Sequence, residues 1–395
     1  MTLFDTMSAE DSLSLPSIAP ATKAMTLLVA DPLYDYYKFD SSSVPDLKIM
    51  ADLIDEAWSK DYSAKGEAVF KYDVDYLTWL LKEDTFDGIW VTTKSGAPAG
   101  VMVLTRRHIK TATTNVPASY GSLFSIGTAH RRAGIGRRIY EVFFYYFTKD
   151  NARALTGVMD GNSGGRKVTD SFVSRDLQVR GAVPYWESLS REYVIWAACP
   201  DMAEVHRYMP LRGLVAKIAL HPWVKHFIEF RYKAPKNLDY SVELVQPLGQ
   251  KDSARNTDVA FAAVDLIKHY GLEHTNIAGT YRITFADGRL CEIYYAILKA
   301  VKPGLPDTQI GQLQFIDHGT ATSKQVRRAT KIVSDMLLKR GCVAILNHHT
   351  GSISALTLLL SGFLPSDRKI RYYSGCFHSL SPKFSVDGKL GFDLL

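Results

Sequence analysis

Apolar residues recur at every third or fourth position early in the chain and predict two amphipathic helices. Met50, Ile54 and Trp58 lie on one face of the first, and a second helical stretch follows around Trp79. Residues 1–24 are instead rich in Ser, Ala and Thr and show no sustained period. We expect them to form a loosely held arm.

β-rich runs follow these helices. Residues 88–93 and 99–105 predict a hairpin, because Gly96 between them supplies a tight turn. A third strand, 119–127, leads into a helix that carries Ile135 and Ile139 on one stripe. The rest of the first half is predicted as a strand at 154–159, a helix that ends near Phe172, and two short strands within 183–196 that close the sheet.

The second half repeats this order of elements without repeating its letters, which indicates a weak internal duplication. We expect an α/β (α+β) protein of two domains, each a mixed, mostly antiparallel sheet flanked by helices. The expected boundaries are an arm at 1–24, a first domain at 25–200, a connection at 201–240 and a second domain at 241–395. Within the second half the predicted helices are 260–270, one carrying Val326 and Val333, and 352–360; the predicted strands are 280–285, 290–300, 310–317, 342–347 and 369–373.

A glycine turn stands between the third strand and the helix that follows it. Its letters are Arg131-Arg132-Ala133-Gly134-Ile135-Gly136. Free N–H groups at a helix start attract anions, and the arginines add positive charge, so we expect a diphosphate to bind there. The corresponding stretch of the second half reads TATSKQVRRAT and has no glycine pair. Only the first copy is therefore expected to hold a diphosphate in this way.

The amino-acid composition limits the classes of ligand that the protein is expected to bind. The chain has 395 residues, with 47 Lys and Arg against 41 Asp and Glu, and this slight excess favours small anionic ligands over nucleic acid. Its four cysteines lie far apart with no CxxC pair, so neither a zinc site nor a disulfide framework is indicated. No apolar stretch reaches the roughly 18 residues of a membrane span. We expect a cytoplasmic protein that binds no membrane and no metal.

The order of the elements, together with this turn, resembles the GNAT superfamily of acyl-CoA N-acyltransferases. The family motif Gln/Arg-x-x-Gly-x-Gly/Ala is matched in full by residues 131–136. The resemblance covers residues 45–197 well and 255–375 by pattern only. It is of the tandem kind seen in N-myristoyltransferases and Fem-type aminoacyl transferases, here with a degenerate second copy.

The resemblance implies how coenzyme A is held. The strand residues Phe124 and Ile126 would bond the pantetheine arm, and Asn162 would lie near the same arm. The diphosphate would sit on the turn formed by Arg131, Arg132, Ala133, Gly134, Ile135, Gly136 and Arg137.

Direct attack of an amine on a thioester needs a donor for the oxyanion and a base for the ammonium proton. A main-chain N–H near Ile126 is the expected donor. The strand before the turn carries no carboxylate, and Phe172 stands where the family often has a Tyr that acts as general acid. Glu187 and Tyr185 are the candidate base and acid. The competing interpretation is that the aromatic residue packs and Glu187 is a solvated charge.

Other polar residues invite weaker hypotheses. His108, beside two arginines, could face the acceptor, although such residues more often form an exposed polar strand end. His318 and the pair His348 and His349 each end a predicted strand, and could supply a base. Adjacent strand residues point to opposite faces, which disfavours a shared metal. N-myristoyltransferases use their terminal carboxylate as base, and the apolar end of this chain would alternatively form a packed strand.

The expected function is therefore transfer of an acyl group, most simply acetyl from acetyl-CoA, to a primary amine, with the second copy shaping the acceptor site. Two alternatives stay open. One is a long-chain or aminoacyl transferase of the tandem kind, which would need a continuous apolar channel. The other is a CoA-sensing or interaction protein that has lost catalysis. The sequence indicates neither the acceptor nor the oligomeric state.

Overall fold

The structure is a computed structural model of the chain. It describes residues 25–63, 68–82, 85–111, 115–148, 153–159, 163–173, 185–188, 193–199, 206–208, 221, 239–248, 259–261, 269–348, 353–376 and 390–391.

The first half has the predicted helices and strands and, in addition, three further strands. Its elements are β1 (Thr26–Ala30), β2 (Tyr34–Phe39), α1 (Leu47–Ser63), β3 (Val69–Lys71), α2 (Val74–Leu80), β4 (Phe86–Thr93), β5 (Pro98–Thr111), β6 (Asn115–Ile126), the 3₁₀ turn η2 (Thr128–His130), α3 (Ile135–Phe147), β7 (Arg153–Met159), α4 (Ser163–Val173), β8 (Tyr185–Ser188) and β9 (Tyr193–Ala198). Of these, β1, β2 and β3 are the strands that the sequence pattern did not predict. The strands β1, β2, β4, β5 and β6 are antiparallel neighbours in that order, and β7 runs parallel to β6.

The second half repeats this plan. Its elements are β10 (Tyr240–Val245), β11 (Val259–Phe261), β12 (Ala278–Phe285), β13 (Leu290–Val301), β14 (Thr308–Asp317), α9 (Ser323–Lys339), β15 (Cys342–His348), α10 (Ala355–Leu360), β16 (Phe363–Cys376) and β17 (Leu390–Gly391). The strands β10, β12, β13 and β14 are antiparallel neighbours, and β15 runs parallel to β14. The expected fold class, a mixed and mostly antiparallel sheet flanked by helices in each half, is confirmed.

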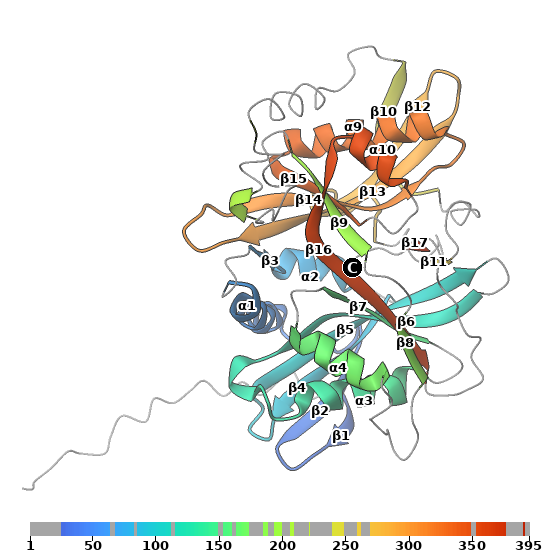
Figure 1. Cartoon of the computed structure of the whole chain (residues 1–395). Coiled ribbons are helices and arrows are strands. Elements are labelled where there is room, and N and C mark those ends of the chain that lie inside the picture. Colours follow the sequence, from blue (N-terminus) through green and yellow to red (C-terminus); the bar gives the residue numbers. More distant parts are fainter. Residues whose placement is uncertain are drawn as a thin grey trace, which may run out of the picture.

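The two halves exchange strands. β9 of the first half pairs with β15, whereas β16 of the second half pairs with β7. In Figure 1 the long β16 crosses the middle of the molecule, so the described strands of both halves belong to one sheet. The expectation that the strands within 183–196 close the first sheet is therefore wrong, because β8 and β9 both pair with strands of the second half. Local alternation specifies a strand, but tertiary packing selects its partner.

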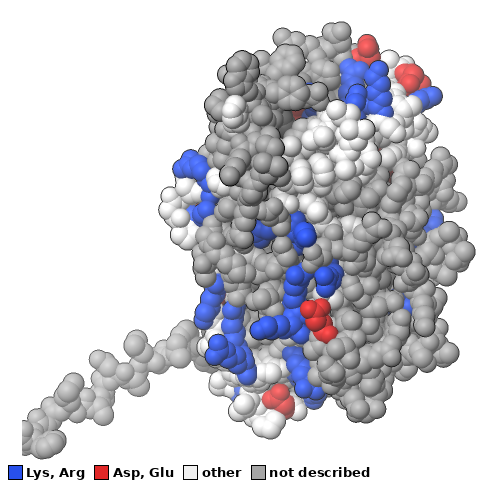
Figure 2. Space-filling view, viewed as in Figure 1, with Lys and Arg blue, Asp and Glu red and all other residues white. Residues whose placement is uncertain are grey.

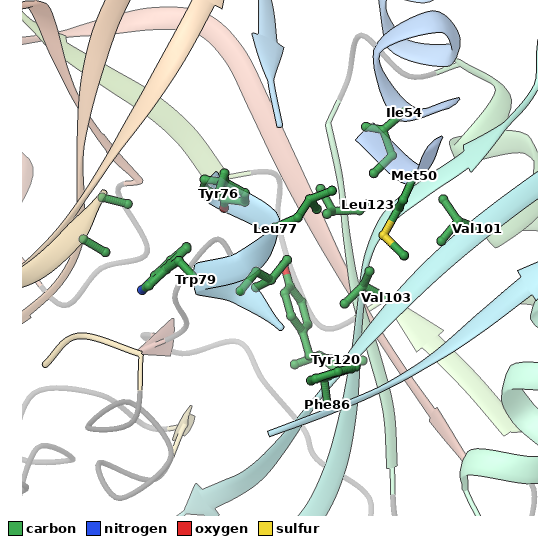
Figure 3. Close-up of a cluster of buried hydrophobic side chains, with 14 of the residues drawn as sticks. Met50, Ile54, Tyr76, Leu77, Trp79, Phe86, Val101, Val103, Tyr120 and Leu123 are labelled. Carbon is green, nitrogen blue, oxygen red and sulfur yellow. The ribbon is translucent and has the colours of Figure 1, made fainter. Parts of the chain in front are cut away.

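The continuous apolar run of β5 is explained by burial on both faces of the sheet. Val101 and Val103 face the cluster formed with α1 and α2, whereas Met102 and Leu104 face α3. The first cluster (Figure 3) is formed by Met50, Ile54, Tyr76, Leu77, Trp79, Phe86, Val101, Val103, Tyr120 and Leu123, among others.

This core continues into the second half. The Trp79 ring lies 5.9 Å from the ring of Tyr270, which in turn lies 5.6 Å from that of Tyr294 on β13. All three side chains are buried. Because each large apolar side chain contributes about 1.5–3 kcal/mol when fully buried, the shared cluster joins the halves strongly.

Two details differ from the expected elements. The predicted helix 260–270 is wrong at its start, because Val259–Phe261 forms β11, which pairs with β5 and β17. A run of three apolar residues fits both structures, and pairing with β5 decides for the strand. Among the described residues, none of the helices has the length and apolar character needed to span a membrane.

Candidate acyl-CoA site

β6 and β7 separate part of the way along their length. Their parallel pairing runs from Ala118 opposite Arg153 to Gly121 opposite Thr156 and then ends. The Thr156 hydroxyl donates to the carbonyl of Gly121 at 2.8 Å, which fixes the apex of the opening. Beyond this apex the two strands leave a gap between them, called the split below.

A β-bulge lies on β6 just past the apex. Leu123 and Phe124 together oppose the single residue Met102 of β5, between the pairs Val103–Ser122 and Val101–Ser125. Neither has a register partner on β7. Leu123 also has a φ of 49°, a conformation that costs a non-glycine residue about 1 kcal/mol or more. The backbone of β6 is thus strained and out of register with its neighbours where the split opens.

The helix α3 begins with unsatisfied amides. Its N-cap is Gly134, in the left-handed region with a φ of 81°, and no side chain caps the first turn. A Cβ added to Gly134 would meet no described atom within 4 Å, so the turn is open on that side. The equivalent α9 is closed instead, because Thr322 and Gln325 form a capping box over its first amides. The expected difference between the two copies therefore has a structural basis.

Gly136 has a second reason to be glycine. A Cβ there would lie 3.0 Å from Cδ1 of Ile126 and 3.2 Å from Cζ of Phe124. These β6 side chains pack directly on the first turn of α3, within the cluster that also contains Val168. The expectation that both glycines serve backbone access to the ligand is thus incomplete for Gly136, where close packing already requires a glycine.

Arginines surround the turn, but not all of their charge is free. Arg137 and Arg138 both pair with Glu141, one turn along α3, at 3.0 and 2.6 Å. Such exposed pairs are weak, and a bound phosphate can displace them. Arg132 is exposed and has a φ of 68°. Figure 2 shows several Lys and Arg side chains and few acidic ones on the described surface in the lower half of this view, where Figure 1 places α3, α4 and β16.

The helix α1 anchors the segment that precedes the turn. The carboxylate of Glu56 accepts hydrogen bonds from the backbone and hydroxyl of Thr128, which lower its pKa. The Arg131 guanidinium donates to the carbonyl of Ala57 at 2.7 Å. The indole of the next residue, Trp58, donates to the Ser125 hydroxyl at 2.9 Å. The helix therefore holds both β6 and the turn in place.

A pocket leads from the split along one face of the sheet. Its lining residues come from β6, β7, β16, β9, β15, β14 and β13, which are neighbours in that order. Trp58 and Tyr62 of α1 and Phe70 and Tyr72 of β3 also line it, and its empty volume is about 1260 Å³, the open space at its mouth included.

The pocket lining is mostly apolar and aromatic, with a few buried polar groups. Near the split, the hydroxyl of Ser122 has no hydrogen-bond partner among the described residues. The Tyr140 side chain on α3 hydrogen-bonds Thr156 at the apex, and burial raises the pKa of this Tyr so that it stays protonated. At the far end lie Gln312 and His348.

The structure brings together most of the residues predicted to bind coenzyme A. Phe124 and Ile126 lie on β6 beside the split, residues 131–134 connect η2 to α3, and residues 135–137 form the first turn of α3. Asn162 lies outside the described residues. The pocket itself includes Phe124 but does not extend over the turn.

The predicted catalytic pair lies at the closed end of the split. On β8, the backbone of Glu187 pairs with Ser374 of β16, which pairs on its other edge with Leu155 of β7. Two strand spacings, about 10 Å, therefore separate Glu187 from β7. Tyr185 pairs with Cys376, still farther from the opening. The side chains of both residues, like that of Phe172 on α4, lie outside what the structure describes.

The other candidates are placed as follows. Beside His108, Arg106 pairs with Asp87 at 2.7 Å and the buried Arg107 contacts His269, so neither arginine lines the pocket. His349 and residues 392–395 lie outside the described part of the chain. In that part, no group of three His, Cys, Asp or Glu side chains is placed to hold a metal ion.

Sequence reasoning missed several residues that line the pocket. Tyr120, Ser122, Tyr140 and Thr156 meet at the split only because β6, α3 and β7 converge there. Gln312 joins them from the second half through the strand exchange. In the sequence all of these look like ordinary strand or helix residues, and of the lining residues only Phe124 and His348 were already candidates.

A scan against protein-family models finds no match, and a search of curated proteins finds no significant match. Among solved structures, the chain is similar to Saccharomyces cerevisiae N-myristoyltransferase with bound myristoyl-CoA. The TM-score is 0.65 at 12% identity, over 94% of this chain and 91% of the yeast protein. A second structure of that enzyme with myristoyl-CoA gives a TM-score of 0.66 at 13% identity, over 94% and 86%. The chain therefore has the fold of this yeast enzyme, as the resemblance implied.

Proposed function

We propose that this protein transfers an acyl group from acyl-CoA to an amine. The observation that carries the proposal is the split between β6 and β7, which opens beside the uncapped start of α3 and continues into the pocket. A CoA diphosphate on the amides of residues 135–137 would place the pantetheine arm along β6. The thioester would then lie at the bulge.

The chemistry follows from this placement. The amine nitrogen attacks the thioester carbonyl carbon, a C–N bond forms, the C–S bond breaks, the amine gives up a proton, and CoA leaves as a thiol. The amides of Leu123 and Phe124, which have no register partners on β5 or β7, are the proposed donors to the oxyanion. Ternary orientation in one pocket supplies much of the remaining rate. Glu187 and Tyr185 remain the proposed base and acid.

The lining favours an acyl group longer than acetyl. Around the split the pocket is bounded by Trp58, Tyr120, Leu123, Phe124, Tyr140 and Val158, whose surfaces are apolar or aromatic. An acetyl group would leave most of this surface uncovered, whereas an alkyl chain gains about 0.8 kcal/mol for each buried methylene. The yeast enzyme of the same fold was crystallised with myristoyl-CoA, which supports this choice without deciding it.

Thiol release tests the proposal directly. The protein is incubated with acyl-CoA donors of increasing chain length, from acetyl to myristoyl, and with a panel of primary amines. We expect amine-dependent release of CoA thiol, with kcat/KM rising from acetyl to longer chains. A preference for acetyl-CoA would overturn the chain-length proposal alone. Tight acyl-CoA binding without thiol release for any amine would favour a CoA-sensing protein instead.

A further inference from the structure

His348 is a buried polar side chain inside an otherwise apolar part of the pocket. It ends β15, opposite Ile195 of β9, and only 8% of its surface is exposed. On the same face of β15, two residues earlier, Leu346 also lines the pocket. The intervening Asn347 points to the other face, where its amide donates to the carbonyl of Leu313. Strand alternation therefore directs the imidazole into the pocket.

The imidazole is not used by the described fold. Its Nδ1 atom is buried and has no hydrogen-bond partner among the described residues. Leaving a buried polar atom unpaired is unfavourable, so most such atoms in native proteins have a partner. Because the His348 ring lines the pocket, a ligand that packs against the ring is a candidate partner for this atom.

The environment of His348 argues against a role as general base. Burial lowers its pKa to about 3, so the ring is neutral near pH 7 and a weak proton acceptor. Its place also separates it from the thioester, because β16 and β9 lie between β7 and β15. Along the sheet, three strand spacings separate β7 from β15. A neutral imidazole with this low pKa can recognise a ligand but is too weak a base to deprotonate the reacting amine.

Gln312 makes the far end of the pocket a small polar site. It is 5% exposed, pairs with Leu346 across β14 and β15, and lines the pocket beside His348. Its side chain hydrogen-bonds that of Gln314 at 2.7 Å. The apolar Leu298 and Leu346 border these groups. A saturated acyl tail reaching this end would leave Nδ1 of His348 unpaired, whereas an acceptor with an amide or hydroxyl would pair with it.

We propose that His348 recognises the acceptor by a hydrogen bond from its Nδ1 to a neutral amide or hydroxyl group, at the end of the pocket away from the split. This inference rests on the proposed acyltransferase function and adds a requirement on the acceptor. The acceptor must be elongated, with an uncharged polar group at its far end. His348 is then a specificity residue, supplied to the active site of the first half by the second half.

A binding experiment without turnover tests the proposal. Hexan-1-ol and 1-chlorohexane, which differ in a hydroxyl that can pair with Nδ1, are titrated into the full-length protein. We expect the wild type to bind the alcohol more tightly than the chloride. His348→Leu should reduce the ratio of the two dissociation constants by about 5- to 100-fold, the usual range for one buried hydrogen bond. His348→Asn keeps a polar atom near Nδ1 and should retain part of the preference for the alcohol. His274→Leu makes the same change at a histidine outside the pocket lining and is the control that should leave the preference unchanged.

Three results would overturn the assignment. The first is equal preference in the wild type and His348→Leu. The second is displacement of hexan-1-ol by myristoyl-CoA but not by CoA, which would show that the acyl chain binds at this end of the pocket. The third is a large fall in melting temperature for His348→Leu, because a residue kept for a ligand can be made apolar with little loss or some gain of stability. A parallel acyl-CoA titration keeps failure of the proposed function separate, since it does not depend on His348.

Discussion

The charge at the start of α3 can be changed with little effect on the fold. Gly134 has a φ of 81°, and its missing side chain would point into open space. Asn and Asp tolerate this conformation better than other residues and have nearly the same shape. Gly134→Asn and Gly134→Asp should therefore fold equally well. They differ only in a negative charge placed beside the proposed diphosphate site.

The expected difference in CoA affinity follows from Coulomb's law. Two unit charges about 5.5 Å apart repel by about 3 kcal/mol at an effective dielectric constant of about 20. Salt and the exposed position reduce this to about 1.4–2.8 kcal/mol, so Gly134→Asp should bind CoA about 10- to 100-fold more weakly than Gly134→Asn. Isothermal titration calorimetry measures both, and the difference should shrink as ionic strength rises.

The matched control adds the same charge at the other helix. Ser323→Asp puts a carboxylate at the exposed first residue of α9, whose amides are already capped by Thr322 and Gln325. CoA affinity should not change there, and an acidic residue at a helix start should stabilise slightly. Equal CoA affinity for the two Gly134 variants, or an equal loss in Ser323→Asp, would refute the diphosphate assignment.

Three other variants test separate parts of the account. Gly136→Ala should lower the free energy of unfolding by about 1–2 kcal/mol through overpacking, because its Cβ would lie 3.0 Å from Cδ1 of Ile126. Adding Ile126→Val, which removes that Cδ1, should restore part of the lost free energy, as measured by urea unfolding. If the second substitution restores nothing, the packing argument is wrong. Glu187→Gln should lower turnover while leaving CoA affinity intact, and unchanged turnover in the thiol-release assay would return Glu187 to an ordinary surface charge. His348→Leu should weaken the pH dependence of the free energy of unfolding. In the wild type the folded pKa of about 3 lies below the ordinary value of 6.5. The neutral ring therefore stabilises the wild type above pH 6.5, and this contribution falls by about 1.4 kcal/mol per pH unit as the pH drops toward 3. Urea unfolding at several pH values should show a steeper loss in the wild type than in the variant, and parallel curves would count against the buried neutral imidazole.

The sequence predicted those parts of the fold that local pattern determines. The period of α1 and α3 and the apolar runs of β4 to β7 reflect burial of one face or of both. The glycine turn could also be predicted from the sequence, because Gly134 requires a positive φ that few other residues adopt. Composition and the order of elements then sufficed for the GNAT resemblance.

The rest depends on contacts between distant residues. Nothing local to β9 or β16 indicates that each pairs with the other half, since alternation is the same for either partner. The packing of Ile126 on Gly136 likewise needs β6 and α3 to be placed together. For the same reason His348 could be noted as a strand-end histidine, but its isolation in an apolar pocket could not be foreseen.

A crystal structure of the protein with a non-hydrolysable acyl-CoA analogue would test the central claim most directly. We expect the diphosphate on the amides of residues 135–137, the pantetheine arm along β6, and the carbonyl at the bulge of Leu123 and Phe124. Density for the nucleotide on another surface, with protein side chains filling the gap between β6 and β7, would contradict the account.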